Sequence, residues 1–537
     1  MNTGTPSAPD PPNPPGRTLA EALLRHLQAG SAQPVALIET HISWVLLTDT
    51  LAYKLKKPVR FPFADFRSIA LRKHFCEEEV RLNRRLAPEL YLGVDPVCGS
   101  AEAPRIGGGG APIDYLVRMR RFPDGALLKE RLQAGLVKPA DLDTLAHRLA
   151  GFHRKALRAD SRMGLGGSAQ VERIAREATA SLLGVANAED ARHVLAIRTW
   201  QQAQARKLGS RWDARLAEGA VRECHGDLHL ANVVWIGDAF QAFDGIEFDP
   251  ALRWIDTLSD LAFLTMDLHA HGRAGLAWRL LDGYLQDSGD YEGIDLLRYY
   301  EVHRAVVRAL VGRLHAQGPG EPDYLACARQ LLRGNRAPRL LITHGLSGSG
   351  KSTLAGRLLE CAGAIRIRSD VERKRLFGLS ALQRSAGVGV DIYTPEATRR
   401  TFDRLARIAD GALRAGYPVI VDAVFLLRAE RACFHALARE RGVPFSILVC
   451  QAEEDELRRR IAARAGDASE ASEAVLERQI AAQEPLDERE QAFALTVRTD
   501  QPIDLPALAA RWQAVQRPSA VQRFPELSAK SHRDHPR

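Results

Sequence analysis

Two hydrophobic patterns divide the chain, and they change near residue 334. Before this point a helical pattern from Thr18 precedes short alternating runs, and long stretches rich in Ala, Leu and Arg follow from about residue 125. After it, short apolar runs alternate with helical stretches. The predicted strands are Val45–Leu47, Ala52–Leu55, Leu92–Val97 and Tyr115–Met119, then Leu340–Thr343, Ala364–Arg368, Val419–Val421, Ser446–Cys450 and Leu495–Val497.

Gly334–Pro338 breaks the pattern and predicts a linker between two domains, 17–334 and 338–516. The alternation of strands and helices beyond it predicts an α/β domain with a five-stranded parallel sheet and covering helices. Residues 1–16 are rich in proline, and 517–537 are polar, so we expect both to be loose tails. The glycine run 107–110 is expected to be a hairpin loop.

The composition is that of an ordinary globular protein: 45% of the 537 residues are hydrophobic and 26% are charged. The net charge of +8 fits phosphorylated ligands but does not by itself indicate nucleic acid. No run of 18 apolar residues is present, which predicts no membrane-spanning helix. The seven cysteines are scattered without a CxxC pair, and no signal peptide is apparent, so we expect a cytoplasmic protein.

The most specific motif lies directly after the first predicted strand of the second domain. Gly345-Leu346-Ser347-Gly348-Ser349-Gly350-Lys351-Ser352 fits G-x-x-x-x-G-K-[ST] at every fixed position. The glycines allow backbone N–H groups to face a phosphate, and the following helix adds its positive end. Lys351 is expected to reach the β- and γ-phosphates, and Ser352 to ligate Mg²⁺. We expect residues 345–353, which include Thr353, to bind ATP.

Polar residues follow the next two predicted strands of this domain. Asp370 and Asp422 come at the strand ends, which parallel strands bring to one edge of the sheet. Asp370 is either a functional acid or a helix cap. Four arginines crowd a later helical stretch and either form a phosphate-binding lid or pair with nearby glutamates on a solvated face. They are Arg458, Arg459, Arg460 and Arg464.

These features resemble the small P-loop kinases: gluconate kinase, polynucleotide 5′-hydroxyl kinase and the zeta-toxin group. The resemblance covers about residues 339–515. It implies that Asp370 accepts the proton of the substrate hydroxyl and that Arg373 holds an anionic group of the acceptor. It implies that Asp422 lies near Mg²⁺ or near the acceptor. The arginine stretch, represented by Arg458 and Arg464, resembles the mobile lid of these kinases.

A second phosphotransfer pattern lies in the first domain. His225-Gly226-Asp227-Leu228-His229-Leu230-Ala231-Asn232 has the form H-x-D-x-x-x-x-N. An Asp and an Asn on one loop can serve two parts of a phosphoryl-transfer centre: Asp227 as proton acceptor and Asn232 as Mg²⁺ ligand. Asp244 follows in an Asp-Gly pair and is the expected second metal ligand, with Glu247 and Asp249 as competitors.

The upstream sequence offers a lysine and a carboxylate for the same centre. Leu51-Ala52-Tyr53-Lys54 has the shape of a kinase lysine strand, and Lys56 shares its face by the period of two. A helical stretch begins at residues 76–80, and Glu79 is preferred over Glu78 as the partner of Lys54 because Leu82 and Leu86 follow it at helical spacing. No glycine-rich loop precedes this lysine; the equivalent stretch is Leu46–Thr50.

Spacing and order together resemble the aminoglycoside phosphotransferase and choline kinase superfamily, from about residue 34 to 332. The phrases HGDLHLANVVW and DTLSDLAFL are typical of it, and the resemblance implies an α+β, bilobal, protein-kinase-like fold. The resemblance also implies that Asp260 holds the catalytic loop in position, because the equivalent residue does so in that family. The whole chain resembles bacterial fusions of an aminoglycoside phosphotransferase-like domain with a P-loop ATP-binding domain.

We therefore expect transfer of the γ-phosphoryl group from ATP to a hydroxyl of a small molecule, with Mg²⁺ as cofactor. One alternative is a regulatory protein in which one domain is a degenerate kinase that only binds nucleotide. Another is a nucleic-acid 5′-hydroxyl kinase or repair factor that acts through the second domain. The acceptor is not identified by the sequence.

Overall fold

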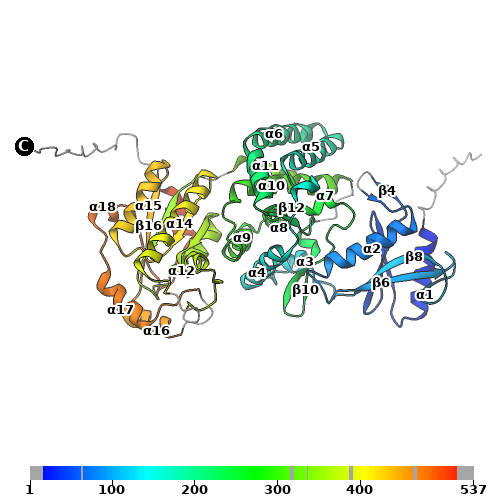
Figure 1. The fold of residues 1–537 in the computed structure, drawn as a ribbon, viewed down its shortest axis with the longest axis horizontal. Coiled ribbons are helices and arrows are strands. Elements are labelled where there is room, and N and C mark those ends of the chain that lie inside the picture. Colours follow the sequence, from blue (N-terminus) through cyan, green and yellow to red (C-terminus); the bar gives the residue numbers. More distant parts are fainter. Residues whose placement is uncertain are drawn as a thin grey trace, which may run out of the picture. The chain divides into compact units, whose positions relative to one another are not determined.

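The computed structural model describes residues 16–61, 64–314, 320–334, 337–385, 391–463 and 468–516. The described chain forms two compact units (Figure 1). The first holds the described parts of Met1–Ser288 and Leu296–Gly334, and the second those of Gly289–Asp295 and Asn335–Arg537. Apart from Gly16, the two predicted tails lie outside the described residues, as do Asn335 and Arg336 of the predicted linker.

The first unit begins with a mixed α/β part built on one antiparallel sheet of order β1-β2-β3-β8-β6-β7. The four strands predicted here are confirmed. The glycine run 107–110 lies between β6 and β8, the two predicted strands on its flanks, and these strands pair antiparallel, so the predicted hairpin connection is confirmed. The short strand β7, which the sequence pattern does not predict, lies in the same connection and pairs with β6. The strands are β1 (Ala36–Glu39), β2 (Ser43–Leu47), β3 (Leu51–Lys56), β6 (Tyr91–Gly99), β7 (Pro104–Ile106) and β8 (Pro112–Arg120).

The two faces of this sheet carry different helices (Figure 1). Helix α1 (Arg17–Ala29) packs through Leu19 and Leu23 against one face, which includes Tyr53 and Leu55 of β3. Helix α2 (Ile69–Asn83) packs against the other face, which includes Ala52. Side chains alternate along a strand, so the even-numbered residues of β3 point towards α2.

The rest of the first unit is largely helical. Helix α8 is buried on all sides from Thr257 to Leu268, and it shares one apolar cluster with α5, α6, α10 and α11. The helices are α3 (Leu128–Gln133), α4 (Pro139–Lys155), α5 (Ser168–Gly184), α6 (Ala188–Ala217), α7 (Pro250–Arg253), α8 (Thr257–Ala270), α9 (Ala274–Ser288), α10 (Ile294–Leu314) and α11 (Tyr324–Arg333), with 3₁₀ turns at Ser161–Met163 and Leu230–Asn232. Three two-stranded ribbons join β4 (Arg60–Phe61) to β5 (Ala64–Asp65), β9 (Val221–Glu223) to β12 (Trp254–Asp256), and β10 (Val233–Ile236) to β11 (Ala239–Ala242).

The second unit is a parallel five-stranded sheet of order β14-β15-β13-β16-β17. This confirms the predicted sheet and its five strands. The strands are β13 (Leu340–His344), β14 (Ile365–Arg368), β15 (Val419–Asp422), β16 (Phe445–Gln451) and β17 (Ala494–Arg498). The helices are α12 (Lys351–Ala362), α13 (Ser369–Leu376), α14 (Pro395–Arg414), α15 (Arg428–Glu440), α16 (Glu454–Ala462), α17 (Glu473–Ala482), α18 (Glu488–Gln491) and α19 (Leu505–Ala514).

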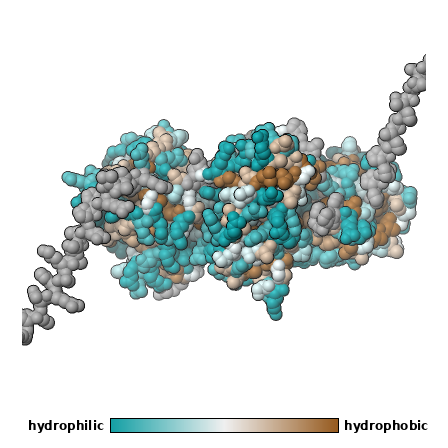
Figure 2. Space-filling model, turned by 90° about the horizontal axis from the view of Figure 1, so that it is seen from above, coloured by the Kyte–Doolittle hydropathy of each residue, from teal (hydrophilic) through white to brown (hydrophobic). Residues whose placement is uncertain are grey.

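Hydrophilic and hydrophobic residues are interspersed over the molecular face in Figure 2. Among the described residues, no helix combines the length and the apolar character needed to cross a membrane.

Candidate functional site

The loop between β13 and α12 has a backbone that requires glycine. Gly345 and Gly348 have φ angles of +142° and +83°. A Cβ atom would lie 2.5 Å from the carbonyl oxygen of Cys450 at the first position and 2.7 Å from that of Leu457 at the second. The loop therefore curls tightly against neighbouring backbone, and α12 begins directly after Gly350.

The polar side chains of the loop lie close to the end of β15. The ammonium group of Lys351 donates to the carbonyl oxygen of Leu346 at 2.7 Å and to the hydroxyl of Ser349 at 3.4 Å. The hydroxyl of Ser352 lies 3.1 Å from Oδ1 of Asp422. The structure thus brings together Ser352 and Asp422, two residues that the sequence marks as metal ligands from positions 70 residues apart.

The second carboxylate oxygen of Asp422 is in an unusual setting. It is buried and accepts no hydrogen bond from a described residue. The guanidinium groups of Arg368 and Arg366, both on β14, approach it at 3.5 and 3.8 Å. This oxygen and the Ser352 hydroxyl offer hard oxygen ligands of the kind that Mg²⁺ prefers.

Asp370 lies in the first turn of α13 but does not cap that helix. The N-cap position is Arg368, and no side chain makes a capping bond there. Within the described chain, the carboxylate of Asp370 has no hydrogen bond or ion pair. The capping alternative therefore fails, and this half-buried carboxylate remains available to a ligand.

Arg373 is held beside Asp370 with part of its guanidinium group unused. Its Nη1 donates to the carbonyl oxygen of Ile392 at 2.9 Å and to the hydroxyl of Thr398 at 3.1 Å, and the group lies over the ring of Tyr393. Its Nε and Nη2 make no hydrogen bond with a described residue. Burial raises the pKa of the Tyr393 hydroxyl to about 12, and the nearby Asp370 adds to that shift.

These groups line one cavity of about 500 Å³. It is bounded by the loop residues Ser347, Gly348, Gly350, Lys351, Ser352 and Thr353, and by Arg368, Asp370, Arg373, Tyr393 and Asp422 on the strand ends and the following helices. The structure therefore joins the phosphate loop, the candidate metal ligands and the candidate base in a single space.

The arginine-rich stretch divides its residues between two roles. Arg458 pairs with Glu454, Glu473 and Glu477 and does not line this cavity. Arg460 does line it, and donates to the carbonyl oxygen of Gly348 at 3.2 Å. Arg464 lies outside the described residues.

Sequence reasoning also missed two cavity residues near α17. Gln479 accepts a hydrogen bond from the backbone N–H of Ser347 at 2.8 Å. Glu470 pairs with the buried Lys374 at 3.0 Å. Neither belongs to a motif, and no signal in the sequence marks them.

In the first unit, both candidate lysines reach the same glutamate. Lys54 and Lys56 lie 2.9 and 2.7 Å from the two carboxylate oxygens of Glu79, which is fully buried on α2. Lys56 also pairs with Glu247, whereas Lys54 also pairs with Asp244 at 2.6 Å. Burial by itself raises the pKa of Glu79, but the two ammonium groups outweigh it and lower that pKa to about 2.

Asp244 is held in a strained and partly exposed position. Its φ angle is +60°, a left-handed conformation that is uncommon for residues other than glycine. Its backbone N–H donates to the Tyr91 hydroxyl at 3.0 Å, and that of Gly245 donates to Asn83 at 2.8 Å. Its side chain is 43% exposed, so one face of the carboxylate is open to a ligand. Asp249, a competing candidate, caps α7 instead.

Asp227 and Asn232 lie side by side on one loop. The Asn232 amide donates to the backbone carbonyl of Asp227 at 3.0 Å and to its carboxylate at 3.1 Å. Nε2 of His229 lies 3.4 Å from the same carboxylate. Burial acts to raise the pKa of Asp227, but the imidazole of His229 more than offsets it and holds that pKa below its usual range.

Asp260 ties down this loop, as expected. Its two oxygens accept the backbone N–H groups of His225 at 3.0 Å and of Gly226 at 2.8 Å. His153 and Cys224 lie near enough to Asp260 for a three-ligand metal group. However, Nε2 of His153 contacts the Asp260 carboxylate directly at 3.1 Å, so these residues already brace one another.

The loop that precedes the lysine strand differs from the expectation. Leu46 and Leu47 belong to β2, and only Thr48–Thr50 form the turn into β3. Arg121 fixes this turn through the carbonyl oxygens of Thr48 and Thr50. A separate turn, Thr40–Ile42, joins β1 to β2.

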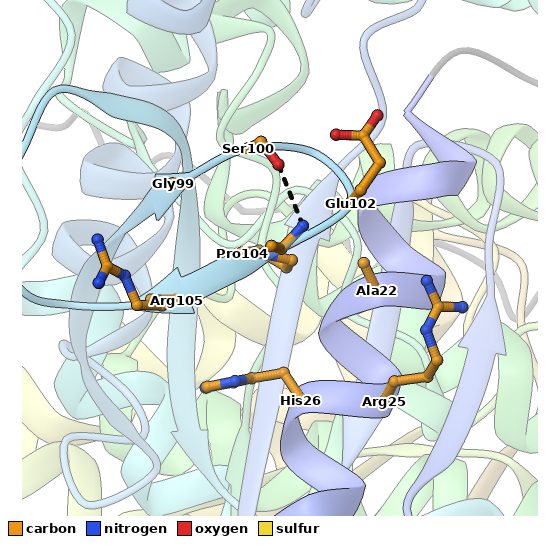
Figure 3. A pocket seen from close by; sticks show the side chains of 9 residues that line it. Ala22, Arg25, His26, Gly99, Ser100, Glu102, Pro104 and Arg105 are labelled. Atoms are coloured by element: carbon orange, nitrogen blue, oxygen red, sulfur yellow. Dashed lines mark hydrogen bonds between the residues drawn. The ribbon is translucent and has the colours of Figure 1, made fainter.

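Another depression of the first unit lies between α1 and the turn from β6 to β7. Figure 3 shows Arg25, His26 and Arg105 around it. It contains no residue predicted for function, and its lining holds no buried charged group.

Comparison with known proteins assigns a class to the second unit. The family model described as AAA domain matches residues 340–486, which contain the phosphate loop, β14, β15 and the arginine-rich helix. The parallel sheet and the G-x-x-x-x-G-K-S loop are the features of a P-loop nucleotide-binding domain.

The chain is 34% identical, over 449 residues, to an uncharacterized protein of Mycobacterium tuberculosis. The match spans 81% of this chain and 87% of the mycobacterial protein. The chain therefore belongs to the family of that protein.

Two solved structures resemble parts of the chain. A sugar kinase from a Janibacter species is 22% identical, with 33% of this chain and 95% of that chain covered and a TM-score of 0.26. A choline/ethanolamine kinase family protein from Mesorhizobium loti is 13% identical, with 59% and 92% covered and a TM-score of 0.33.

Proposed function

We propose that the second unit is an ATP-dependent phosphotransferase that moves the γ-phosphoryl group to a hydroxyl of a small molecule. One observation carries the proposal: the unpartnered carboxylate of Asp370 lies in the same cavity as the phosphate loop. A domain that only bound nucleotide would not need an available carboxylate there. A phosphotransferase needs one to accept the proton of the attacking hydroxyl.

Mg²⁺ fits this cavity. The support is the pair formed by Ser352 and Asp422 and the buried Asp422 oxygen that accepts no hydrogen bond from a described residue. Ser352 and Asp422 would hold the ion, which supplies charge neutralisation for the phosphates when bound.

The cavity side chains then have distinct roles. Lys351 turns from the Leu346 carbonyl to the phosphates, and Arg460 lies near enough to the loop to add positive charge. Asp370 takes the hydroxyl proton. Arg373 offers its unused Nε and Nη2 to the acceptor, so we propose an acceptor with an anionic group.

The test uses three variants of the full chain and an acceptor screen for ATP-dependent mass gain, in which 5′-hydroxyl oligonucleotides stand beside small hydroxy acids. Lys351→Ala removes most ATP binding by this unit, because the backbone amides alone do not replace the lysine charge. Asp370→Asn keeps ATP binding but lowers transfer by about 10²–10⁴-fold. Arg357→Ala, exposed on the same helix α12, changes neither. Equal ATP affinity in Lys351→Ala and the parent overturns the proposal.

A second candidate function concerns the first unit, which we propose to be a protein-kinase-like phosphotransferase of the aminoglycoside phosphotransferase and choline kinase type. The specific support is that Lys54 bridges Glu79 and Asp244 while Asp227 and Asn232 share one loop. Lys54 would orient the phosphates of ATP, Asp244 and Asn232 would hold Mg²⁺, and Asp227 would accept the acceptor's proton. A unit that only binds nucleotide is the competing hypothesis, favoured by the absence of glycines at Thr48–Thr50.

A further inference from the structure

A side chain of the second unit itself is hydrogen-bonded to the phosphate loop. The backbone N–H of Ser347 donates to the carboxamide oxygen of Gln479 at 2.8 Å. Both residues line the cavity that holds Lys351 and Asp370. A neutral carbonyl oxygen therefore sits on an N–H group of the loop that is built to bind phosphate oxygens.

Helix α17, which carries Gln479, is held by ion pairs along its N-terminal half and just before it. Arg458 on α16 pairs with Glu473 at 2.6 Å and with Glu477 at 2.5 Å. Before the helix, Glu470 pairs with the buried Lys374 at 3.0 Å. These contacts hold Gln479 over the loop without any contribution from a nucleotide.

Other groups of the loop are also satisfied from within the chain. Lys351 donates to the Leu346 carbonyl at 2.7 Å, and Arg460 donates to the Gly348 carbonyl at 3.2 Å. The loop N–H group and the two cationic side chains that are expected to bind phosphate are thus hydrogen-bonded within the chain instead.

We propose that Gln479 is an autoinhibitory latch, whose carboxamide oxygen takes the place of a phosphate oxygen on Ser347 and must be displaced when nucleotide binds. The inference rests on the proposed function, because it requires that the loop bind nucleotide. The latch lowers the apparent affinity for ATP by the free energy needed to break its hydrogen bond and move α17 away.

The probe is Mg-ATP titrated calorimetrically into the full chain, and the binding step of interest is the one that Lys351→Ala removes. Gln479→Ala deletes the latch and tightens that step by about three- to tenfold, the range expected for one lost hydrogen bond. Gln479→Glu keeps an acceptor for Ser347 and adds negative charge beside the phosphates, so it weakens the step by about tenfold or more.

Gln483→Ala, at the end of the same helix and outside the cavity lining, is the matched control and leaves the affinity unchanged. If Gln479→Ala does not fold, Gln479→Asn replaces it, because the shorter side chain withdraws the amide from Ser347. Unchanged or weaker binding by the folded variant, with normal binding by the parent, overturns the latch alone. Absence of a Lys351-dependent step in the parent overturns the proposed function itself.

Discussion

Three carboxylates that the sequence singles out differ because of their neighbours. Asp370 has no partner among the described residues, Asp422 meets a hydroxyl and two guanidinium groups, and Asp227 is held by Asn232 and His229. A carboxylate that accepts a proton must stay ionised and accessible, whereas one that binds a metal needs oxygens that no cation of the chain fully neutralises. These environments are the physical basis for assigning different roles.

The roles proposed in the first unit are separable at single residues. Asp227→Asn keeps Mg-ATP binding and lowers phosphoryl transfer by about 10²–10⁴-fold, because it removes only the proton acceptor. Asp244→Asn weakens Mg-ATP binding instead, because it removes a charged metal ligand. Asn is the suitable replacement there, since it tolerates the φ angle of +60° better than Ala.

Calorimetry with Mg-ATP and a turnover assay with an identified acceptor check both variants. Loss of ATP binding in Asp227→Asn with normal binding in Asp244→Asn shows that the roles are reversed. Unchanged turnover in both variants leaves the first unit as a binding module.

At the scale of elements, buried charges join α2 to β3. Glu79 on the helix receives two lysines from one strand face, and both sides of this contact are buried. Because its pKa is lowered to about 2 from an ordinary 4.5, the ionised form stabilises the fold fully above pH 4.5. That stabilisation is lost as the pH falls through about 2.

Glu79→Gln is therefore expected to lower the free energy of unfolding at pH 7 by about 3–5 kcal/mol, the cost of breaking a buried pair. At pH 3.5 the difference in the free energy of unfolding between variant and parent is smaller by about 1 kcal/mol or more. The reason is that the parent has lost part of the stabilisation that ionised Glu79 provides. Urea unfolding at the two pH values measures it. Glu77→Gln, on the exposed face of α2, serves as the control. A difference that grows on acidification contradicts the lowered pKa.

Arg458 lies at the contact of α16 with α17, and a variant of it can distinguish a structural role from a phosphate-binding lid role. Its ion pairs with Glu454, Glu473 and Glu477 are exposed to solvent, so each contributes little to stability. Arg458→Ala is expected to speed hydrogen exchange in α17 without weakening Mg-ATP binding, because the helix loses its fastening and the phosphates lose no contact. Arg459→Ala, whose side chain pairs with Glu456 on its own helix, leaves the exchange unchanged. Weaker ATP binding in Arg458→Ala supports a direct lid role for Arg458 instead.

At the scale of the whole molecule, the chain order and the compact units do not coincide. Gly289–Asp295 lies in the second unit, although it comes between two helices counted mainly with the first. The Tyr291 hydroxyl in this segment donates to the backbone carbonyl of Arg366 on β14 at 3.2 Å. A boundary at 334–338 therefore leaves a small part of the second unit behind.

Residues 17–334 and 338–516, expressed separately, are each expected to give a cooperative thermal melt, because each contains its own apolar core. The second fragment melts below the corresponding transition of the full chain, since it lacks the segment that contains Tyr291. Tyr291→Phe in the full chain lowers that transition by the equivalent of about 0.5–1.5 kcal/mol, one hydrogen bond. Two fragments without cooperative melts contradict the two-domain organisation.

Features that depend on neighbours along the chain can be predicted from the amino-acid sequence alone. Alternation and apolar runs located four of the six strands of the first sheet and all five strands of the second, because side-chain direction repeats every two residues. The G-x-x-x-x-G-K-S spacing located the phosphate loop, since its glycines occupy positions where the local backbone leaves no room for a Cβ atom. The spacing also placed Lys54 and Lys56 on one face of a strand, which the shared Glu79 confirms.

Contacts between residues distant in the chain are apparent only from the folded structure. It removed Asp370 from a capping role, put Ser352 beside Asp422, and turned Arg458 to the glutamates of α17. It also placed β8 between β3 and β6 and brought Gln479 onto Ser347, 132 positions away. Such contacts depend on how helices and strands pack, and packing energies between residues remote in the chain leave no periodic or motif signal in the sequence.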